Sequence, residues 1–394
     1  MPDWKKLLRS QNWKVILLLV LVTGSLCAPI YFHRITVPVD TDYGTHVAFT
    51  QQLLAGQELN TGVLSHPVIQ LVLAGMVLAS GGRLGPYGCL IILQVLTQAF
   101  TALILCFYLG QGQRRGWDWL RAGVALTLTF VGPIMLLAFK DGLFFYGYVG
   151  LANYHNPTIH LLKPFALLSF LFAVWAVSGQ MSRGGGILAS ALLIMLAAWI
   201  KPNYTLSILA ALGLVVLIRL LQHSRVDWKL LLFGFYLPGL LTLGLQWWIA
   251  YSHGDPGTGI VWAPFQVESA YSHDLALKFL LSVLFPLVVL VLARRSLLKD
   301  SDLLVAWAGF LAGAAQFYLL AEGGDRMYHA NFRWSAQVML FLLFAAAARW
   351  FFRQGWLEGR ICLPQRWIAN LTYLAHLAGG VAYYIYCMVS IHYR

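Results

Sequence analysis

Residues 15–32 read VILLLVLVTGSLCAPIYF, an apolar stretch without a single charged residue. A hydrocarbon core about 30 Å thick is crossed by a helix of about 20 apolar residues, so this stretch predicts a membrane span. Basic residues precede it, as in a signal peptide, but no small-x-small cleavage pattern follows it. We therefore interpret it as a retained first span.

Similar apolar stretches recur along the whole chain. A shorter run, 67–80, begins at His66-Pro67 and is predicted to be re-entrant or interfacial. The sequence thus predicts an all-α, polytopic transmembrane bundle that forms one domain over 1–394, with about eleven spans and a short amphipathic helix in the first outer loop. The predicted spans are 15–32, 86–109, 119–139, 158–178, 187–200, 204–222, 229–251, 275–293, 303–321, 334–351 and 369–389.

The composition excludes several classes of protein. Hydrophobic residues make up 59% of the chain and charged residues 11%, whereas soluble proteins carry about 25% charged residues. A soluble enzyme, a nucleic-acid binder and a disordered protein are therefore excluded. The net charge of +12 fits Lys and Arg gathered in cytoplasmic loops. The five cysteines lack C-x-x-C spacing and indicate neither a disulfide framework nor a metal cluster.

The basic clusters fall in alternate loops, and placing all of them inside predicts a cytoplasmic N-terminus in the cell (inner) membrane. Nine of the eleven histidines and nine of the fifteen acids then lie outside or at the outer boundary. Because ionisable residues at membrane depth are costly and usually functional, the chemistry is predicted to face outward. The predicted outer loops are 33–65, 140–157, 201–203, 252–274 and 322–333.

The first outer loop contains Asp40 and Asp42, two residues apart, just before an amphipathic stretch that ends at Gly56. His46 lies one helical turn after Asp42 on the same face. Either carboxylate could accept a proton from a hydroxyl group, and the two together could share a divalent metal ion, Mn²⁺ or Mg²⁺. The competing interpretation is that Asp42 only caps the helix.

This arrangement resembles the GT-C superfamily of membrane glycosyltransferases. The likeness covers residues 15–66: a first span, then an acidic outer loop, then an amphipathic helix. It implies many spans, a polyprenyl-phosphate sugar donor and a catalytic Asp in the first outer loop, hence Asp42 or Asp40. Many members add a soluble C-terminal domain; this sequence shows none, which makes a lipid or glycan acceptor more natural than a protein.

Two further motifs place lysines near predicted helix ends. The first is Asn153-Tyr-His155-Asn-Pro-Thr-Ile-His160-Leu-Leu-Lys163, and the second is the sharp break at Lys201-Pro202. Lys163 and Lys201 are predicted to contact a lipid phosphate together, and His155 to belong to the same substrate site. The structural alternatives are a capped helix start at Pro157, and a tight turn with snorkelling lysines.

The loop 322–333 concentrates function-capable side chains between two apolar helices. Arginine offers a planar fork for phosphate, and aromatic rings offer a face for a sugar. The alternative is a solvated loop held by a salt bridge. The loop 252–274, rich in Gly and Pro, is predicted to be a mobile lid. The substrate-binding candidates in 322–333 are Glu322, Arg326, His329 and Asn331.

The leading hypothesis is an inverting glycosyltransferase that moves a sugar from polyprenyl phosphate to an acceptor hydroxyl at the outer surface. Its predicted partners are the lipid-linked sugar, a lipid or glycan acceptor and the bilayer, with no nucleic acid. One alternative is a polysaccharide polymerase or ligase that acts on lipid-linked oligosaccharide and needs no outer-loop Asp. The other is a transporter or flippase, which predicts charged groups along a path and internal repeats; the sequence shows neither.

Overall fold

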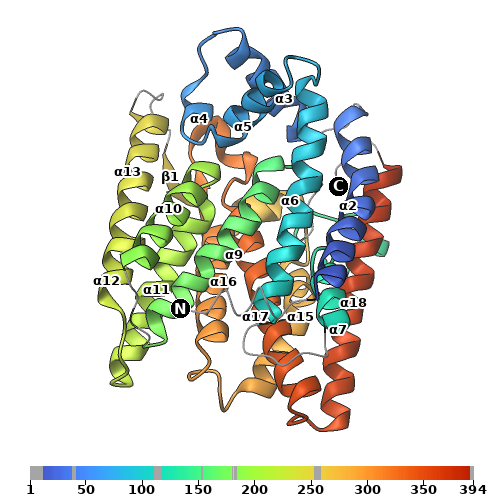
Figure 1. Ribbon diagram of the computed structural model, residues 1–394, viewed down its shortest axis with the longest axis vertical. Helices are drawn as coiled ribbons and strands as arrows, with labels where there is room; N and C mark the ends of the chain where they lie inside the picture. Colours follow the sequence, from blue (N-terminus) through green and yellow to red (C-terminus); the bar gives the residue numbers. More distant parts are fainter. Residues whose placement is uncertain are drawn as a thin grey trace.

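The computed structural model describes residues 12–37, 41–110, 118–151, 154–179, 181, 184–252 and 259–390. Most of them form helices that run side by side along the long axis of the molecule (Figure 1). Among the described residues, eight helices are long and apolar enough to cross a membrane. They are α2 (Trp13–Thr36), α6 (Pro86–Leu109), α9 (Pro157–Val177), α11 (Asn203–Leu221), Trp228–Tyr251, α15 (Leu275–Ala293), α16 (Ser301–Leu319) and the segment Gly324–Leu357.

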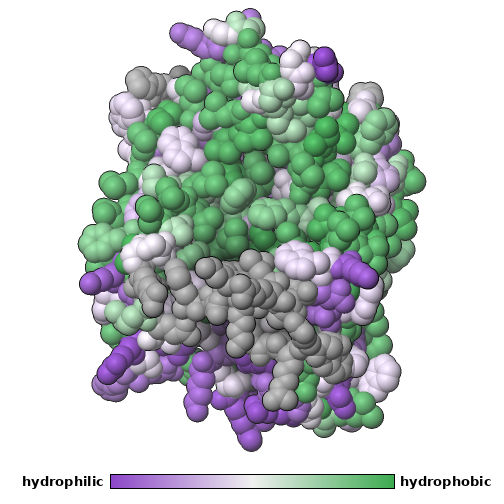
Figure 2. Space-filling model, viewed as in Figure 1, coloured by the Kyte–Doolittle hydropathy of each residue, from purple (hydrophilic) through white to green (hydrophobic). Residues whose placement is uncertain are grey.

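The prediction of an all-α bundle with the build of a multi-pass membrane protein is confirmed. Hydrophobic side chains cover much of the middle of the surface, and hydrophilic side chains gather mainly toward one end (Figure 2). The centre of the core is α17 (Arg333–Phe351), which is apolar on all sides and buried along nearly its whole length. Gly313 on α16 permits its close packing, since a Cβ there would lie 2.7 Å from the Ser335 carbonyl oxygen. Two further helices, α5 (Val68–Ala79) and α10 (Gly184–Ile200), are apolar but shorter than the eight long ones.

The predicted span 119–139 is not one helix. Helix α7 (Asp118–Leu128) ends after 11 residues, and the chain then runs through the core without helical structure, because Pro133 has no N–H and disfavours helix at Gly132. Neighbouring helices satisfy this backbone: the Gly132 N–H donates to the His376 carbonyl at 3.0 Å, and His376 Nδ1 lies 2.7 Å from the Gly132 carbonyl oxygen. Irregular backbone at membrane depth is tolerated where protein buries it in this way.

Glycines on α18 (Leu363–Val389) make room for the irregular segment. A Cβ at Gly380 would lie 1.7 Å from the Phe130 carbonyl oxygen, and one at Gly379 would lie 1.9 Å from that of Pro133. Neither position can therefore hold a larger residue without moving the backbone.

One end of the bundle is covered by short helices at the top of Figure 1. Helix α3 (Asp42–Leu54) is the amphipathic helix predicted for the first outer loop, and it is followed by α4 (Thr61–Leu64) and α5. Gly56 adopts φ +69, the left-handed conformation expected where a helix stops. The run 67–80, predicted to be re-entrant or interfacial, forms α5, which packs against α3 and α6 in this end cap.

Two short strands depart from the all-helical prediction at the same end. Strand β1 (Ile260–Trp262) pairs antiparallel with β2 (Leu320–Glu322), and Ile260 lies opposite Glu322. The next helix, α14 (Gln266–Tyr271), places Glu268 against Arg333 in a buried ion pair at 2.9 Å. Strand pairing and this ion pair anchor residues 259–274 to the bundle, and the mobile lid over 252–274 stays a prediction.

The remaining elements are short or interrupted. Helix α8 (Ala138–Asp141) follows the irregular segment. The span 228–251 consists of α12 (Trp228–Leu231), the π-helical turn η1 (Leu232–Tyr236) and α13 (Leu237–Tyr251). The 3₁₀ turn η2 (Gly324–His329) precedes α17, and a second π-helical turn, η3 (Phe352–Leu357), follows it.

Candidate functional site

The covered end of the bundle contains a cavity of about 490 Å³. One wall is apolar and comes from the facing sides of α11 and α13. The other end is polar and comes from four segments that are far apart in the sequence: the start of α5, the turn before α11, the end of α13 and residues 322–331. The apolar wall includes Leu206, Leu240, Leu243, Gly244, Trp247 and Ala250, and the polar end includes His66, Lys201, Asn203, Tyr251, Glu322, Arg326 and Asn331. The cavity thus has a cationic end that opens into an apolar groove.

Lys201 lies in the turn between α10 and α11, where Pro202 separates the two helices. Its Nζ donates to Thr158 Oγ1 at 3.2 Å and lies 5.0 Å from the centre of the Trp334 ring. Within the described part of the chain, no carboxylate lies within 4 Å of this buried amine. Burial lowers the pKa of Lys201 to about 8, although the charges of Asp42 and Glu322 act to raise it. At neutral pH the amine therefore remains charged and short of counter-charge.

Arg326 is held in place by Glu322. The Arg326 Nε lies 3.1 Å from Glu322 Oε2, the same oxygen accepts from Asn331 Nδ2 at 2.6 Å, and the Tyr251 hydroxyl donates to Oε1 at 3.0 Å. The Asn331 carbonyl in turn accepts from Asn203 Nδ2 at 2.9 Å. The salt bridge weighed as an alternative for this loop therefore exists. It leaves Arg326 on the cavity wall with 38% of its side chain exposed.

Asp42 is the first residue of α3, and its carboxylate does not cap that helix. Thr41 occupies the N-cap position, and no side-chain cap bond is formed. Instead, Asp42 Oδ2 accepts from Asn156 Nδ2 at 2.5 Å and lies 3.6 Å from His155 Nε2. The interpretation of Asp42 as a cap is therefore wrong, and 39% of its side chain remains exposed.

A chain of hydrogen bonds connects Asp42 to the cavity. Asn156 caps α9 by accepting from the backbone N–H groups of Thr158 and Ile159, as its place before Pro157 predicts. The Thr158 hydroxyl donates to Asn156 Oδ1 at 2.5 Å, and Lys201 donates to that hydroxyl. Asp42 does not itself line the cavity. Three hydrogen bonds between side chains separate it from Lys201.

His155 and His329 line a second, smaller cavity of about 80 Å³, together with Trp334 and Arg333. The His155 ring stacks on Trp334 at 6.2 Å between centroids, so Trp334 has Lys201 near its ring and His155 stacked on it. His46 lies 2.9 Å from Gln70 Nε2 through its Nδ1. Burial lowers the pKa of His46 to about 4, with Asp42 opposing the shift, so His46 is neutral at neutral pH.

The structure does not bring Lys163 beside Lys201 on the cavity wall. The Lys163 Nζ donates to the Leu151 carbonyl at 2.6 Å and lies 5.4 Å from the centre of the Phe341 ring, deep in the bundle. It lines none of the cavities described here. The structure therefore gives no support to a phosphate contact shared with Lys201, because Lys163, the seventh residue of α9, lies in the core and not at the cavity.

The metal hypothesis depends on Asp40, which lies outside the described residues. Among the residues that are described, no three His, Cys, Asp or Glu side chains are grouped to hold a metal ion. The proposal that Asp40 and Asp42 share Mn²⁺ or Mg²⁺ therefore stays a prediction.

Sequence reasoning missed His66 as a site residue. It lines the polar end of the cavity with Lys201 and Arg326. The available signal was a histidine next to a proline at the start of an apolar run. This pattern indicates where a helix begins, but it does not indicate which residues will lie near the histidine.

No protein-family model matches this sequence, and comparison with curated proteins finds no match either. The chemistry of the chain has to be inferred from its own residues and their geometry.

Proposed function

We propose that this protein is a membrane glycosyltransferase with a GT-C-like fold of about eleven spans. It would transfer a sugar from a polyprenyl-phosphate donor to a hydroxyl of a lipid or glycan acceptor on the outer face of the cell membrane. The observation that carries the proposal is the cavity, which joins a cationic end at Lys201 and Arg326 to an apolar groove between α11 and α13.

The shape and charge of the cavity suit a lipid that carries one phosphodiester. Lys201 and Arg326 are cationic and Glu322 is anionic, so the polar end has one unmatched positive charge for the single negative charge of the donor. The groove side is open: a methyl group added at Gly244 would meet no atom within 4 Å. A polyprenyl chain can lie there while its phosphate reaches the two cations.

In this proposal Asp42 acts as the general base from beside the cavity, three side-chain hydrogen bonds from Lys201. The acceptor hydroxyl would give its proton to the Asp42 carboxylate while its oxygen attacks the anomeric carbon. The bond from that carbon to the phosphate oxygen would break, and its electron pair would leave with the lipid phosphate. Lys201 and Arg326 would stabilise the growing negative charge. The exposed edge of Asp42 admits an acceptor, and Asn156 fixes the carboxylate toward the start of α9.

The transporter alternative requires a polar path through the bundle. Between its ends, α17 is lined by buried apolar residues, and only Ser335 and Gln337 are polar between Trp334 and Ala348. This packing favours an enzyme that works at one surface. A flux assay with purified protein in vesicles separates the two classes, because a transporter moves a labelled lipid-linked sugar across the bilayer and a surface enzyme does not.

The test of the base is Asp42→Asn. Asparagine still accepts from Asn156 but cannot take a proton, so turnover should fall about 10²–10⁴-fold while donor binding changes little. Asp325→Asn, an exposed acid on η2, is the matched control and should keep wild-type turnover. Asp40→Asn separates the two chemistries, because a loss at both Asp40 and Asp42 that added Mn²⁺ or Mg²⁺ relieves indicates a shared metal ion. Wild-type turnover in purified Asp42→Asn contradicts the assignment.

A further inference from the structure

His66 occupies a fixed position at the polar end of the cavity. It lies between α4 and α5, and its backbone N–H donates to the Val63 carbonyl at 3.1 Å. Gln246 on α13 holds the preceding residue: its Nε2 donates to the Ser65 carbonyl at 2.7 Å and to the Ala198 carbonyl at 2.8 Å. Contacts from α4, α10 and α13 therefore fix the backbone around His66. Its imidazole lines the same cavity as Lys201 and Arg326.

The contacts of Ser65 determine which nitrogen of His66 carries the proton. The Ser65 hydroxyl donates its one hydrogen to the Gly62 carbonyl at 2.8 Å, because a carbonyl oxygen can only accept. The same hydroxyl oxygen lies 2.9 Å from His66 Nδ1, so Nδ1 carries a hydrogen and donates to it. Nε2 is then unprotonated and acts as an acceptor.

The imidazole also stays neutral. Burial lowers the pKa of His66 to about 3, and the charges of Lys201 and Arg326 add to the effect. The polar end of the cavity thus presents a neutral imidazole acceptor as well as the two cationic donors. The oxygens of the phosphodiester carry no hydrogen, and neither do those of the fully ionised monoester in the bare lipid, so the phosphate alone satisfies Lys201 and Arg326 but leaves Nε2 without a partner.

We propose that His66 Nε2 accepts a hydrogen bond from a sugar hydroxyl next to the phosphate, so that the cavity distinguishes a glycosylated lipid phosphate from the bare one. In a sugar joined to phosphate through its anomeric carbon, the hydroxyl on the neighbouring carbon lies near the phosphate oxygens. A site that places a neutral acceptor in the same cavity as two cations can therefore recognise that hydroxyl. This inference rests on the proposed donor and makes His66 a residue that sets donor specificity.

The experiment measures dissociation constants in nanodiscs for three probes: a polyprenyl phosphate, the same lipid carrying a hexose, and the same lipid carrying a 2-deoxyhexose. His66→Met removes the acceptor and should weaken only the hexose lipid, by roughly 2- to 10-fold, the range for one hydrogen bond. His66→Gln can place an amide oxygen near the Nε2 position and should recover part of the loss. On wild-type protein, the 2-deoxyhexose lipid should lose the same factor, and His66→Met should weaken it no further.

The outcomes separate this inference from the proposed function. If His66→Met weakens all three lipids equally, or none, His66 does not read the hydroxyl and the inference is overturned. If wild-type protein binds none of the lipids, the donor assignment fails and takes the inference with it. If the lipids bind and His66 discriminates among them but Asp42→Asn keeps full turnover, the proposed base fails and the inference stands. Gel filtration of each variant confirms that the folded protein is compared.

Discussion

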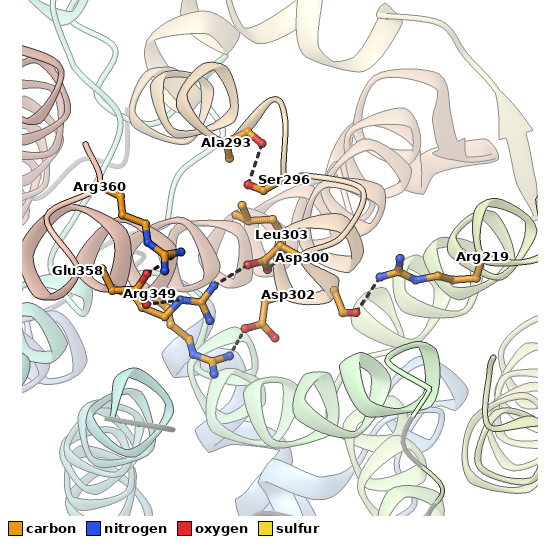
Figure 3. A network of polar contacts seen from close by, with 11 residues as sticks. Arg219, Ala293, Ser296, Asp300, Asp302, Leu303, Arg349, Glu358 and Arg360 are labelled. Carbon is orange, nitrogen blue, oxygen red and sulfur yellow. Dashed lines mark hydrogen bonds and ion pairs between the residues drawn. The ribbon is translucent and has the colours of Figure 1, made fainter. Parts of the chain in front are cut away.

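Both ends of α16 and α17 carry ion pairs, but the cavity end also holds a buried amine, Lys201, that has no carboxylate partner among the described residues. The helices are 19 residues long and separate the ends by about 28 Å. At one end, Arg349 pairs with Asp302, Arg353 with Asp300 at 3.1 Å, and Arg360 with Glu358 at 3.1 Å (Figure 3). At the other end, Glu322 pairs with Arg326 and also accepts hydrogen bonds from Asn331 and Tyr251. Lys201 has no carboxylate within 4 Å among the described residues.

Charged side chains at the paired end hold helices together, whereas at the cavity end a charged side chain remains available for a ligand. The paired end joins helices: Arg219 on α11 donates to the Leu298 carbonyl at 2.6 Å and to Ser301 at 2.8 Å, which ties α11 to α16. The cavity end instead keeps a buried amine with an incomplete set of partners. Because burying an unpaired charge is costly, its presence beside an amphiphilic cavity favours a bound anion.

The largest expected effect is on transfer. Lys201→Met or Arg326→Met should lower turnover roughly 10²–10³-fold, since in the proposed mechanism each removes a cation that stabilises the leaving phosphate. Lys201→Met should raise thermal stability, because a costly buried charge disappears, whereas Arg326→Met should lower it, because Glu322 is only 10% exposed and loses its ion partner. Arg353→Met, at the paired end, is the matched control and should keep wild-type turnover per folded molecule. Equal losses of transfer in all three variants would erase the distinction between the two ends.

The next effect is on stability at the paired end. Arg349→Met leaves Asp302 without its partner, and it removes the guanidinium that lies 4.8 Å from the centre of the Tyr108 ring. Both side chains of the pair are only 15% exposed, so the free energy of unfolding should fall by about 2–3 kcal/mol. Reversible unfolding in mixed micelles measures the change.

Arg360→Met serves as the control for that measurement. Its side chain is 70% exposed, and its pair with Glu358 should contribute less than about 0.5 kcal/mol. An Arg349→Met variant as stable as the control would show that the ion pairs in Figure 3 do not stabilise the fold.

The smallest effect is a pH dependence at the cavity end. Because burial lowers the pKa of Lys201 to about 8, binding of the glycosylated lipid should weaken as pH rises through 8, by at most tenfold per pH unit. The phosphodiester does not titrate in this window. Unfolding cannot explain the loss: the unfolded chain binds more protons between about pH 8 and 10.5, so this group makes the fold more stable as pH rises.

The control for the pH measurement is Lys201→Arg, which stays charged and should bind independently of pH over the same range. Titration of lipid binding between pH 7 and 9.5 tests both proteins. A profile that falls equally in wild type and Lys201→Arg would place the titrating group elsewhere.

Local patterns in the sequence were enough to predict most helices. Apolar length predicted the long helices, Pro157 the start of α9, and Gly56 the end of α3. The span 119–139 failed because hydropathy ignores the break that Gly132-Pro133 makes, and because the partners of that backbone lie on α18, more than 240 residues away.

The candidate site was predictable only in part, because its contacts are long-range. The loops that carry Lys201, Glu322 and Arg326 were recognised as polar breaks between apolar runs. The bond from Asn156 to Asp42 spans 114 residues, and no periodicity reports it. His66 was missed and Lys163 misplaced for the same reason: their roles depend on which neighbour each side chain meets after folding.

The most direct measurement is a density map of the protein in nanodiscs with a polyprenyl-phosphate hexose. We expect phosphate density between Lys201 and Arg326, a hydroxyl of the sugar facing His66, and the lipid chain along Leu240 and Leu243 of α13. Phosphate density beside Arg349 and Arg353, with the cavity between α11 and α13 empty, would contradict this expectation.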